Sequence, residues 1–142
     1  MPGLRIGALA DRTGTNAPTI RYYEAIGLLR KPDRRSGGQR VYGEEDVRRL
    51  TFIRRCRDLG LSIERVRALL SLAQNRGRSC MEARDIAHEH LMAVRSKLKE
   101  LKALERGIAS FVASCDRLCA GGPGSDCVIL DDLGRFPARQ RA

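Results

Sequence analysis

Apolar residues recur in short helical periods along the first half of the chain, separated by glycine and proline breaks. The first period predicts a helix over 6–13, closed by Gly14. A second helix is expected to begin at Ala17, with Asn16 as its N-cap and Pro18 in its first turn. Two short helices joined by a tight turn are typical of a helix-turn-helix, whose second helix enters the major groove of DNA.

A glycine pair lies between two basic arms in the segment 29–42. This arrangement predicts a β-hairpin, the wing of a winged helix-turn-helix. The hairpin would offer Arg34, Arg35 and Arg40 to phosphate groups.

Two further helices are expected after the hairpin. The first covers 44–59, begins with three acidic residues at the positive end of its dipole and stops at Gly60. Ser62 caps the next helix, which runs to about residue 74. The arginines of the 44–59 helix form either a solvated face or a set of DNA-backbone contacts; they are Arg48, Arg49, Arg54, Arg55 and Arg57.

The most regular pattern lies in the second half of the chain. Between Met81 and Cys115 there is no proline and only one glycine, Gly107. Apolar side chains recur there in steps of three and four, at positions 87, 91, 94, 98, 101, 104, 108, 111 and 115. This is the seam of a coiled coil, and a single helix of that length cannot bury such a stripe alone. The helix either folds back on its own domain or pairs with a second copy, and the length of the seam favours a dimer.

Charge divides the chain into two parts. Residues 1–78 hold 17 of the 27 Lys and Arg but only eight of the 17 Asp and Glu, and 16 of those 17 basic residues are Arg. An arginine-rich half is suited to a polyanion, while the remainder, with four of the five cysteines, is suited to sensing. Because the chain shows no membrane-spanning run and no apolar signal core, we expect a cytoplasmic protein that does not contact membranes.

Four cysteines suggest a soft-metal site. Cys80 and Cys115 lie 35 residues apart, or roughly 50 Å along a helix, so they cannot share a ligand within one chain. Antiparallel pairing of two helices would bring Cys80 of one copy to Cys115 of the other. Cys119 follows one helical turn after Cys115, and the glycine-rich loop can return Cys127 to the same place.

The fifth cysteine and the two histidines have simpler interpretations. Cys56 lies on the apolar side of its helix and is expected to be a packing residue. His88 and His90 are two residues apart on a helix, so they point to different faces and do not chelate one ion together.

Three stretches of the chain resemble the MerR family of bacterial transcriptional regulators, in its heavy-metal-sensing branch. They are residues 6–29, containing TIRYYEAIGLL, residues 37–70, containing GGQRVYGEEDVRRL, and the loop CAGGPGSDCVIL over 119–130. The resemblance implies a homodimer with winged helix-turn-helix heads and an antiparallel coiled coil. Such a dimer binds double-stranded promoter DNA and, when an effector binds, bends and untwists that DNA so that bacterial RNA polymerase can open it.

The resemblance also assigns roles to individual residues. Thr19, Arg21 and Tyr22 match DNA-contacting positions of the recognition helix, and Arg40 and Tyr42 match the wing.

Among the cysteines, Cys80 matches a position that holds Cys in sensors of divalent ions and Ser in copper(I) sensors. The chain departs from the family pattern by about four inserted residues, 116–119. Either Cys119 is the working ligand on a longer helix, or Cys115 keeps that role and Cys119 is a fourth thiol.

The fold class that we expect is mainly α, with a winged helix-turn-helix head, a long antiparallel coiled-coil dimerisation helix and a C-terminal metal-binding loop. The domains would cover 1–78, 79–118 and 119–133, followed by a disordered tail over 134–142. The ligands would be Cys80, Cys115, Cys119 and Cys127, holding Hg, Cd or Pb; Zn is also compatible, with Asp116 or Asp126 completing a tetrahedron.

Other functions remain open at this point. Within the same family, the alternatives are a copper(I) or gold(I) sensor using only the C-x7-C loop and an iron–sulfur redox sensor, although the C-x3-C-x7-C spacing is wider than the latter uses. An architectural DNA-binding protein is a further alternative. An enzyme is not expected, since the sequence contains no C-x-x-C, nucleotide-binding loop or Ser/His/Asp set.

Overall fold

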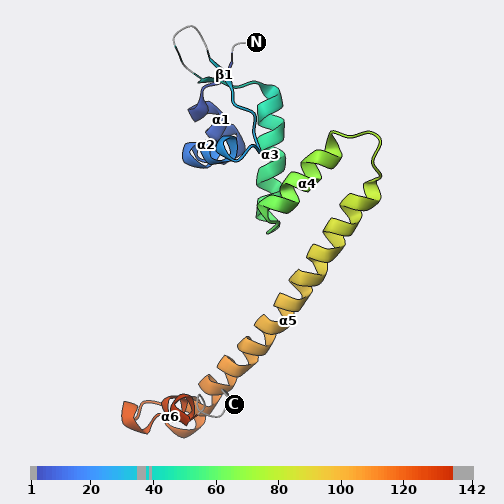
Figure 1. Cartoon of the computed structure of the whole chain (residues 1–142). Coiled ribbons are helices and arrows are strands. Elements are labelled where there is room, and N and C mark those ends of the chain that lie inside the picture. The colour runs from blue at the N-terminus through green and yellow to red at the C-terminus, as the bar shows by residue number, and fades with distance from the viewer. Residues whose placement is uncertain (1–2, 35–37, 39, 136–142) are drawn as a thin grey trace. The chain divides into compact units, whose positions relative to one another are not determined.

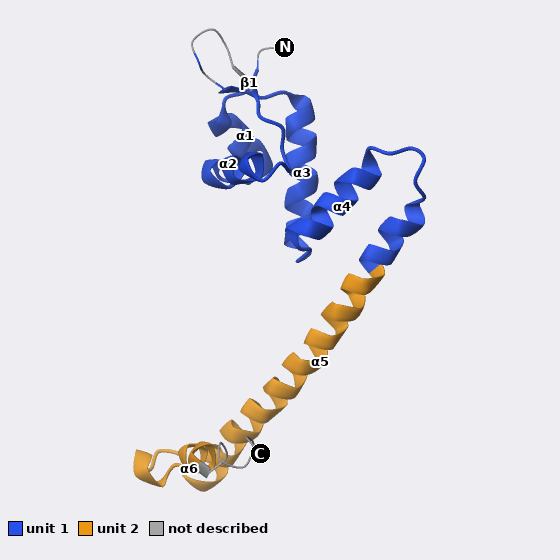
Figure 2. Cartoon of the chain, viewed as in Figure 1, with its two compact units in different colours: residues 1–87 blue, residues 88–142 orange. Residues whose placement is uncertain are grey.

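The structure is a computed structural model of the chain, and it describes residues 3–34, 38 and 40–135 (Figure 1). In chain order the elements are α1 (Ile6–Thr13), α2 (Ala17–Ala25), β1 (Asp33–Arg34), β2 (Arg40–Val41), α3 (Glu44–Asp58), α4 (Ile63–Ala73), α5 (Cys80–Leu118), the 3-10 helix η1 (Gly124–Asp126) and α6 (Val128–Arg135). The chain divides into two compact units, residues 1–87 and 88–142, and α5 begins in the first and continues in the second (Figure 2). No helix in the described part of the chain is long and apolar enough to cross a membrane.

The predicted helix-turn-helix is present in α1 and α2. Gly14 closes α1 in the left-handed conformation, with φ of 67°. The side chain of Asn16 accepts a hydrogen bond of 2.9 Å from the backbone N–H of Thr19, so it caps α2 as expected. Helix α2 ends at Ala25, and Leu28 lies beyond the helix but is still buried.

The predicted hairpin is also present. Strands β1 and β2 are antiparallel, with Asp33 opposite Val41 and Arg34 opposite Arg40. Just after β2, the backbone of Tyr42 exchanges two hydrogen bonds of 2.8 Å with that of Leu4, which ties the start of the chain to the wing.

Helices α3 and α4 lie within one residue of their predicted limits, and both have capped N-termini. The carboxylate of Asp46 accepts a hydrogen bond of 2.9 Å from the N–H of Gly43, before α3. Ser62 accepts one of 3.2 Å from the N–H of Arg65, in α4. Side chains from α1–α4 and the segments between them form the core; those most completely buried are Leu9, Ile20, Leu28, Tyr42, Leu50, Ile53 and Val66.

Two arginines of the head satisfy backbone carbonyls at helix ends. Arg54 of α3 donates to the carbonyl of Gly14, which follows α1. Arg67 of α4 donates a bond of 2.7 Å to the carbonyl of Ile26, which follows α2. Helix C-termini leave carbonyls without intrahelical partners, so these side chains stabilise the packing of α3 and α4 against the helix-turn-helix.

A buried acid connects α2 to the wing. Glu24 is only 6% exposed, and its two carboxylate oxygens have different partners. One oxygen accepts a bond of 2.6 Å from Nη1 of Arg40, and the other accepts one of 2.6 Å from the hydroxyl of Tyr42. Burial and the bond to Glu24 raise the pKa of Tyr42 to about 12, so the hydroxyl keeps the proton that it donates.

Helix α5 has no buried residue along its 39 residues. Six of the large apolar side chains of the predicted seam are 42% to 61% exposed, and the seventh, Phe111, is half-buried; the six are Leu91, Val94, Leu98, Leu101, Leu104 and Ile108. The helix therefore has the uncovered stripe that the sequence predicts.

The C-terminal element is longer than the sequence indicates. Helix α6 includes residues 134 and 135, which the sequence assigns to a disordered tail. Residues 136–142, the remainder of that tail, lie outside the described residues.

The connection through Glu24 can be tested by replacing Tyr42 with Phe. This change leaves one buried carboxylate oxygen without its donor, and we expect the free energy of unfolding to fall by about 1–3 kcal/mol. Tyr22→Phe is the matched control, because Tyr22 is 54% exposed and its change should stay within about 0.5 kcal/mol. Urea denaturation followed by circular dichroism measures both; equal stability of the two variants would contradict the assignment.

Candidate metal centre and DNA-binding surface

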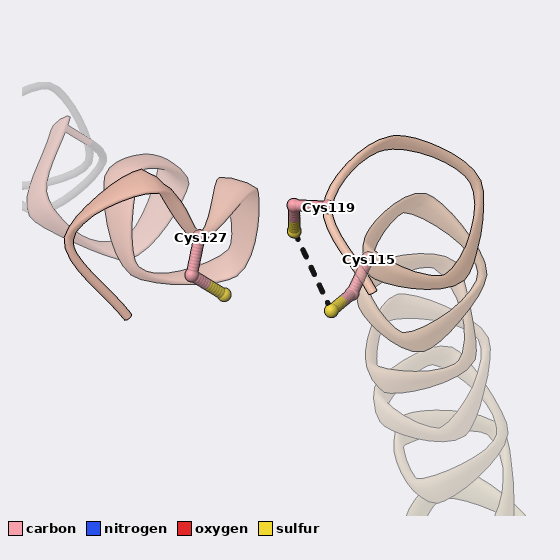
Figure 3. A group of neighbouring side chains, drawn as sticks. All are labelled: Cys115, Cys119 and Cys127. Atoms are coloured by element: carbon pink, nitrogen blue, oxygen red, sulfur yellow. Dashed lines mark hydrogen bonds between the residues drawn. The ribbon is translucent and has the colours of Figure 1, made fainter. Parts of the chain in front are cut away.

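Three of the four cysteines predicted to bind metal lie together at the C-terminal end of α5. The ligand atoms of Cys115, Cys119 and Cys127 all lie within 4.8 Å of one another, and the three residues are half-buried. The sulfurs of Cys115 and Cys119 are 3.5 Å apart, and the thiol of Cys127 points toward this pair (Figure 3). Within the described residues this is the one such cluster of His, Cys, Asp or Glu ligands.

The backbone after α5 brings the third thiol to the first two. Cys119 remains in helical register with Cys115, since its N–H bonds to the Cys115 carbonyl at 2.9 Å. The chain then reverses at Gly121, whose φ of 79° favours a residue without a side chain. Two bonds in the turn follow: Gly122 N–H to the Cys119 carbonyl at 2.9 Å, and Cys127 N–H to the Gly124 carbonyl at 3.1 Å.

Cys127 directly precedes α6 and occupies its N-cap position. Its carbonyl accepts the first helical hydrogen bond, 3.1 Å from the N–H of Asp131. The backbone N–H groups of Leu130 and Ile129 favour the charged thiolate, so they lower the pKa of Cys127. The start of α6 therefore stabilises a thiolate in the cluster.

Cys115 has the opposite electrostatic environment. Its hydrogen bond with Cys119, its partial burial and the neighbouring sulfur charges raise its pKa to about 11. Metal binding at this cluster must then release protons, so the apparent affinity should rise with pH over the neutral range.

The spacing of the three thiols is close to that of a metal site. Zinc–thiolate bonds are about 2.3 Å long, so sulfurs around one tetrahedral zinc lie about 3.8 Å apart. The sulfurs of the cluster lie within 4.8 Å of one another, so sharing such an ion requires them to approach by up to about 1 Å, and thiolates select soft ions. The carboxylates of Asp116 and Asp126 are exposed and are not members of the cluster.

The two remaining cysteines lie in the other compact unit. Cys80 is exposed and is the first residue of α5, preceded by Ser79, whose hydroxyl accepts a bond of 3.0 Å from the N–H of Met81. Cys56 is buried in the core, and burial raises the pKa of its thiol. The prediction that Cys56 is a packing residue is confirmed.

Residues of α2 present the predicted DNA-contacting side chains. Arg21 is exposed, Tyr22 is 54% exposed and Thr19 is half-buried. Ile20 and Tyr23, on the opposite side of the same helix, are buried in the core, so the core fixes the orientation of this face.

The residues named in the wing have different environments. Arg34 lies in β1, and Arg35 lies outside the described residues. Arg40 is partly exposed and is held by Glu24. Tyr42 is 2% exposed, so in this conformation its side chain supports the wing from within and does not face a phosphate.

Two groups that shape the wing and the cysteine cluster were not identified from the sequence. The first is Glu24, which holds Arg40 and Tyr42 of the wing. Its acidic side chain lies next to an apolar position of α2, and this was the feature of the sequence that could have indicated it. The backbone amides at the start of α6 stabilise Cys127, and the order Cys, then three apolar residues, then two acids could have indicated a helix after that cysteine.

Two family profiles match the chain over overlapping regions. Residues 4–73 match the MerR HTH family regulatory proteins, and residues 47–111 match the profile described as MerR, DNA binding. Together they cover the winged head and most of α5.

Individual relatives match most of the chain. The HTH-type transcriptional regulator HmrR of Rhizobium leguminosarum bv. viciae is 40% identical over 130 residues, which are 92% of this chain and 97% of that protein. The mercuric resistance operon regulatory protein of Shigella flexneri is 38% identical over 115 residues, 81% of this chain and 78% of that protein. Among solved structures, the transcription regulator PbrR691 from Ralstonia metallidurans CH34 in complex with lead(II) has a TM-score of 0.76 and 37% identity, covering 92% of this chain and 98% of that one.

The opposite pKa shifts predict different reactivities for two cysteines of the cluster. In reduced, metal-free protein at pH 8, iodoacetamide should modify Cys127 before Cys115, because the thiolate is the nucleophile. Mass spectrometry of the digested protein measures both rates. The same reaction on the chain unfolded in guanidinium is the control, in which the two rates should converge. Equal rates in the folded protein would contradict the electrostatic description.

Proposed function

Because the chain belongs to the MerR family of transcriptional regulators, we propose that it is a metal-responsive activator, which binds a promoter as a homodimer and distorts the DNA when a soft divalent ion binds its cysteines. Family membership makes it a DNA-binding regulator of transcription, not an enzyme. The observation that carries the metal response is the convergence of the thiols of Cys115, Cys119 and Cys127.

The head reads the promoter through α2 and the wing. We assign the groove contacts to Thr19, Arg21 and Tyr22, on the side of α2 that faces away from the core. In the wing, Arg34, Arg35 and Arg40 contact phosphates, while Tyr42 holds the wing in place through Glu24.

The homodimer forms along α5. Its uncovered apolar stripe includes a groove of about 480 Å³ lined by Leu101, Leu104, Ile108 and their neighbours. A second copy of the same helix, packed antiparallel, supplies a complementary apolar stripe.

Cys80 of one copy then completes the site formed by the cluster of the other. The family resemblance supports this role, and so does the position of Cys80 at the far end of α5 from the cluster. The lead(II) complex of PbrR691 and the mercuric regulator among the relatives favour Pb or Hg as the inducer, with Cd and Zn as further divalent candidates. Since Cys115 and Cys119 both belong to the cluster, we assign both as ligands together with Cys127.

In this proposal, metal binding affects transcription by changing the arrangement of the two copies in the dimer. The ion joins the end of α5 in one copy to the start of α5 in the other, next to the second copy's DNA-binding head. Distortion of the promoter then lets bacterial RNA polymerase open it. A copper(I) or gold(I) sensor, or an iron–sulfur protein, differs from this proposal in not needing Cys80.

Complementation between two inactive variants tests the interchain site and the dimer together. Cys80→Ser keeps the cluster intact, while Cys127→Ser breaks the cluster but keeps Cys80. Each homodimer should lack tight Pb(II) binding. Mixing the two under conditions that exchange subunits should restore it, because the heterodimer contains one complete site.

Ultraviolet absorption of thiolate-to-lead charge transfer, measured anaerobically against a competing thiol, follows the binding. The Cys56→Ser variant is the control, since Cys56 is buried in the core and should not change the titration. Full Pb(II) binding by Cys80→Ser alone would contradict the interchain site, because the cluster of one copy would then hold the ion without Cys80. Visible absorption bands before metal addition would favour an iron–sulfur cluster.

A further inference from the structure

A small pocket on the head is lined by three arginines from three separate segments. Arg5 precedes α1, Arg21 lies on α2 and Arg40 lies in β2; with Ile6 they surround a volume of about 210 Å³. Arg21 and Arg40 belong to the DNA contacts proposed above. Arg5 is not among them, and no sequence motif pointed to it.

The backbone brings these segments together. The paired hydrogen bonds between Leu4 and Tyr42 place the start of the chain beside the wing. Gly3 permits this approach, because a Cβ atom at that position would collide with the side chain of Val41. Arg5 directly follows Leu4, so these main-chain contacts fix the position of its backbone.

The walls of the pocket are mostly the apolar parts of these side chains, and the three arginines make the surface around it positively charged. Among the described residues, the one carboxylate that pairs with any of these arginines is that of Glu24, which binds Nη1 of Arg40. A guanidinium carries five N–H donors, so Arg40 can bind Glu24 and still donate to a phosphate at the mouth of the pocket. Arg5 and Arg21 are exposed, and neither forms an ion pair with any residue in the described parts of the chain.

We propose that this pocket binds a phosphodiester group of the DNA backbone, and that Arg5 is a DNA-contacting residue. Guanidinium groups match phosphate geometry, and contacts from three arginines, one before α1, one on α2 and one in the wing, would fix the depth and angle at which α2 enters the groove. The inference rests on the proposed DNA-binding function and deepens it by naming a contact that is independent of base sequence.

The test uses full-length protein and two 30-base-pair duplexes of unrelated sequence, over a series of salt concentrations, with binding measured by fluorescence anisotropy. Arg5→Ala should weaken binding about three- to tenfold and should reduce the slope of log K against log salt by about 1. Arg5→Lys, which keeps the charge, should retain most of the slope. Arg76→Ala is the matched control, since it removes one exposed arginine from the loop between α4 and α5.

Thermal melts establish that the variants are folded, as expected for an exposed side chain. A salt slope for Arg5→Ala equal to that of Arg76→Ala would overturn the proposal. An effect of Arg5→Ala that differs between duplex sequences at unchanged slope would also overturn it, because the contact would then be to a base. This assay measures DNA binding without metal. If the proposed metal response is wrong, the lead titrations will show it, and the conclusion about Arg5 will not change.

Discussion

The uncovered apolar stripe of α5 is the constraint on which the rest of the molecule depends. The helix is 39 residues long and buries none of its own side chains, whereas the head contains all of the buried apolar residues in the described parts of the chain. A helix of this kind gains little stability from its hydrogen bonds alone and needs a packing partner. The proposed dimerisation along α5 would satisfy that need. In such a dimer, the length of the helix would set the distance between the cysteine cluster of one copy and the head of the other.

The arginines of the head divide between structure and binding. Arg54 and Arg67 stabilise helix ends, and Arg40 is held by the buried carboxylate of Glu24. Arg5 and Arg21 remain exposed beside the pocket. A positive surface on which one arginine is fixed by an internal acid is preorganised, so less side-chain entropy is lost when a phosphate binds.

Local sequence rules were sufficient for most of the fold. Gly14, Asn16 and Ser62 mark helix ends through short-range hydrogen bonds or a left-handed turn, and the structure uses each of them as predicted. The cysteine spacing likewise predicted the cluster, because a helical turn and a glycine reversal are local features. The parts that were not predicted depend on contacts between distant segments. The burial of Tyr42 depends on Glu24, 18 residues away, and the placement of Arg5 depends on pairing between residues 4 and 42. The family resemblance placed Tyr42 among the DNA-contacting residues of the wing, whereas in the structure its side chain is buried.

The central claim is that a metal ion at the cysteine cluster changes the shape of DNA bound by the head. Fluorescence energy transfer between dyes at the two ends of a duplex, selected by the wild-type protein from a random-sequence library, measures that shape directly. Addition of Pb(II) should change the transfer efficiency with the wild-type protein and leave it unchanged with Cys127→Ser, while both proteins stay bound. An equal change with both proteins, or no change with wild type while Pb(II) is bound, would contradict the account.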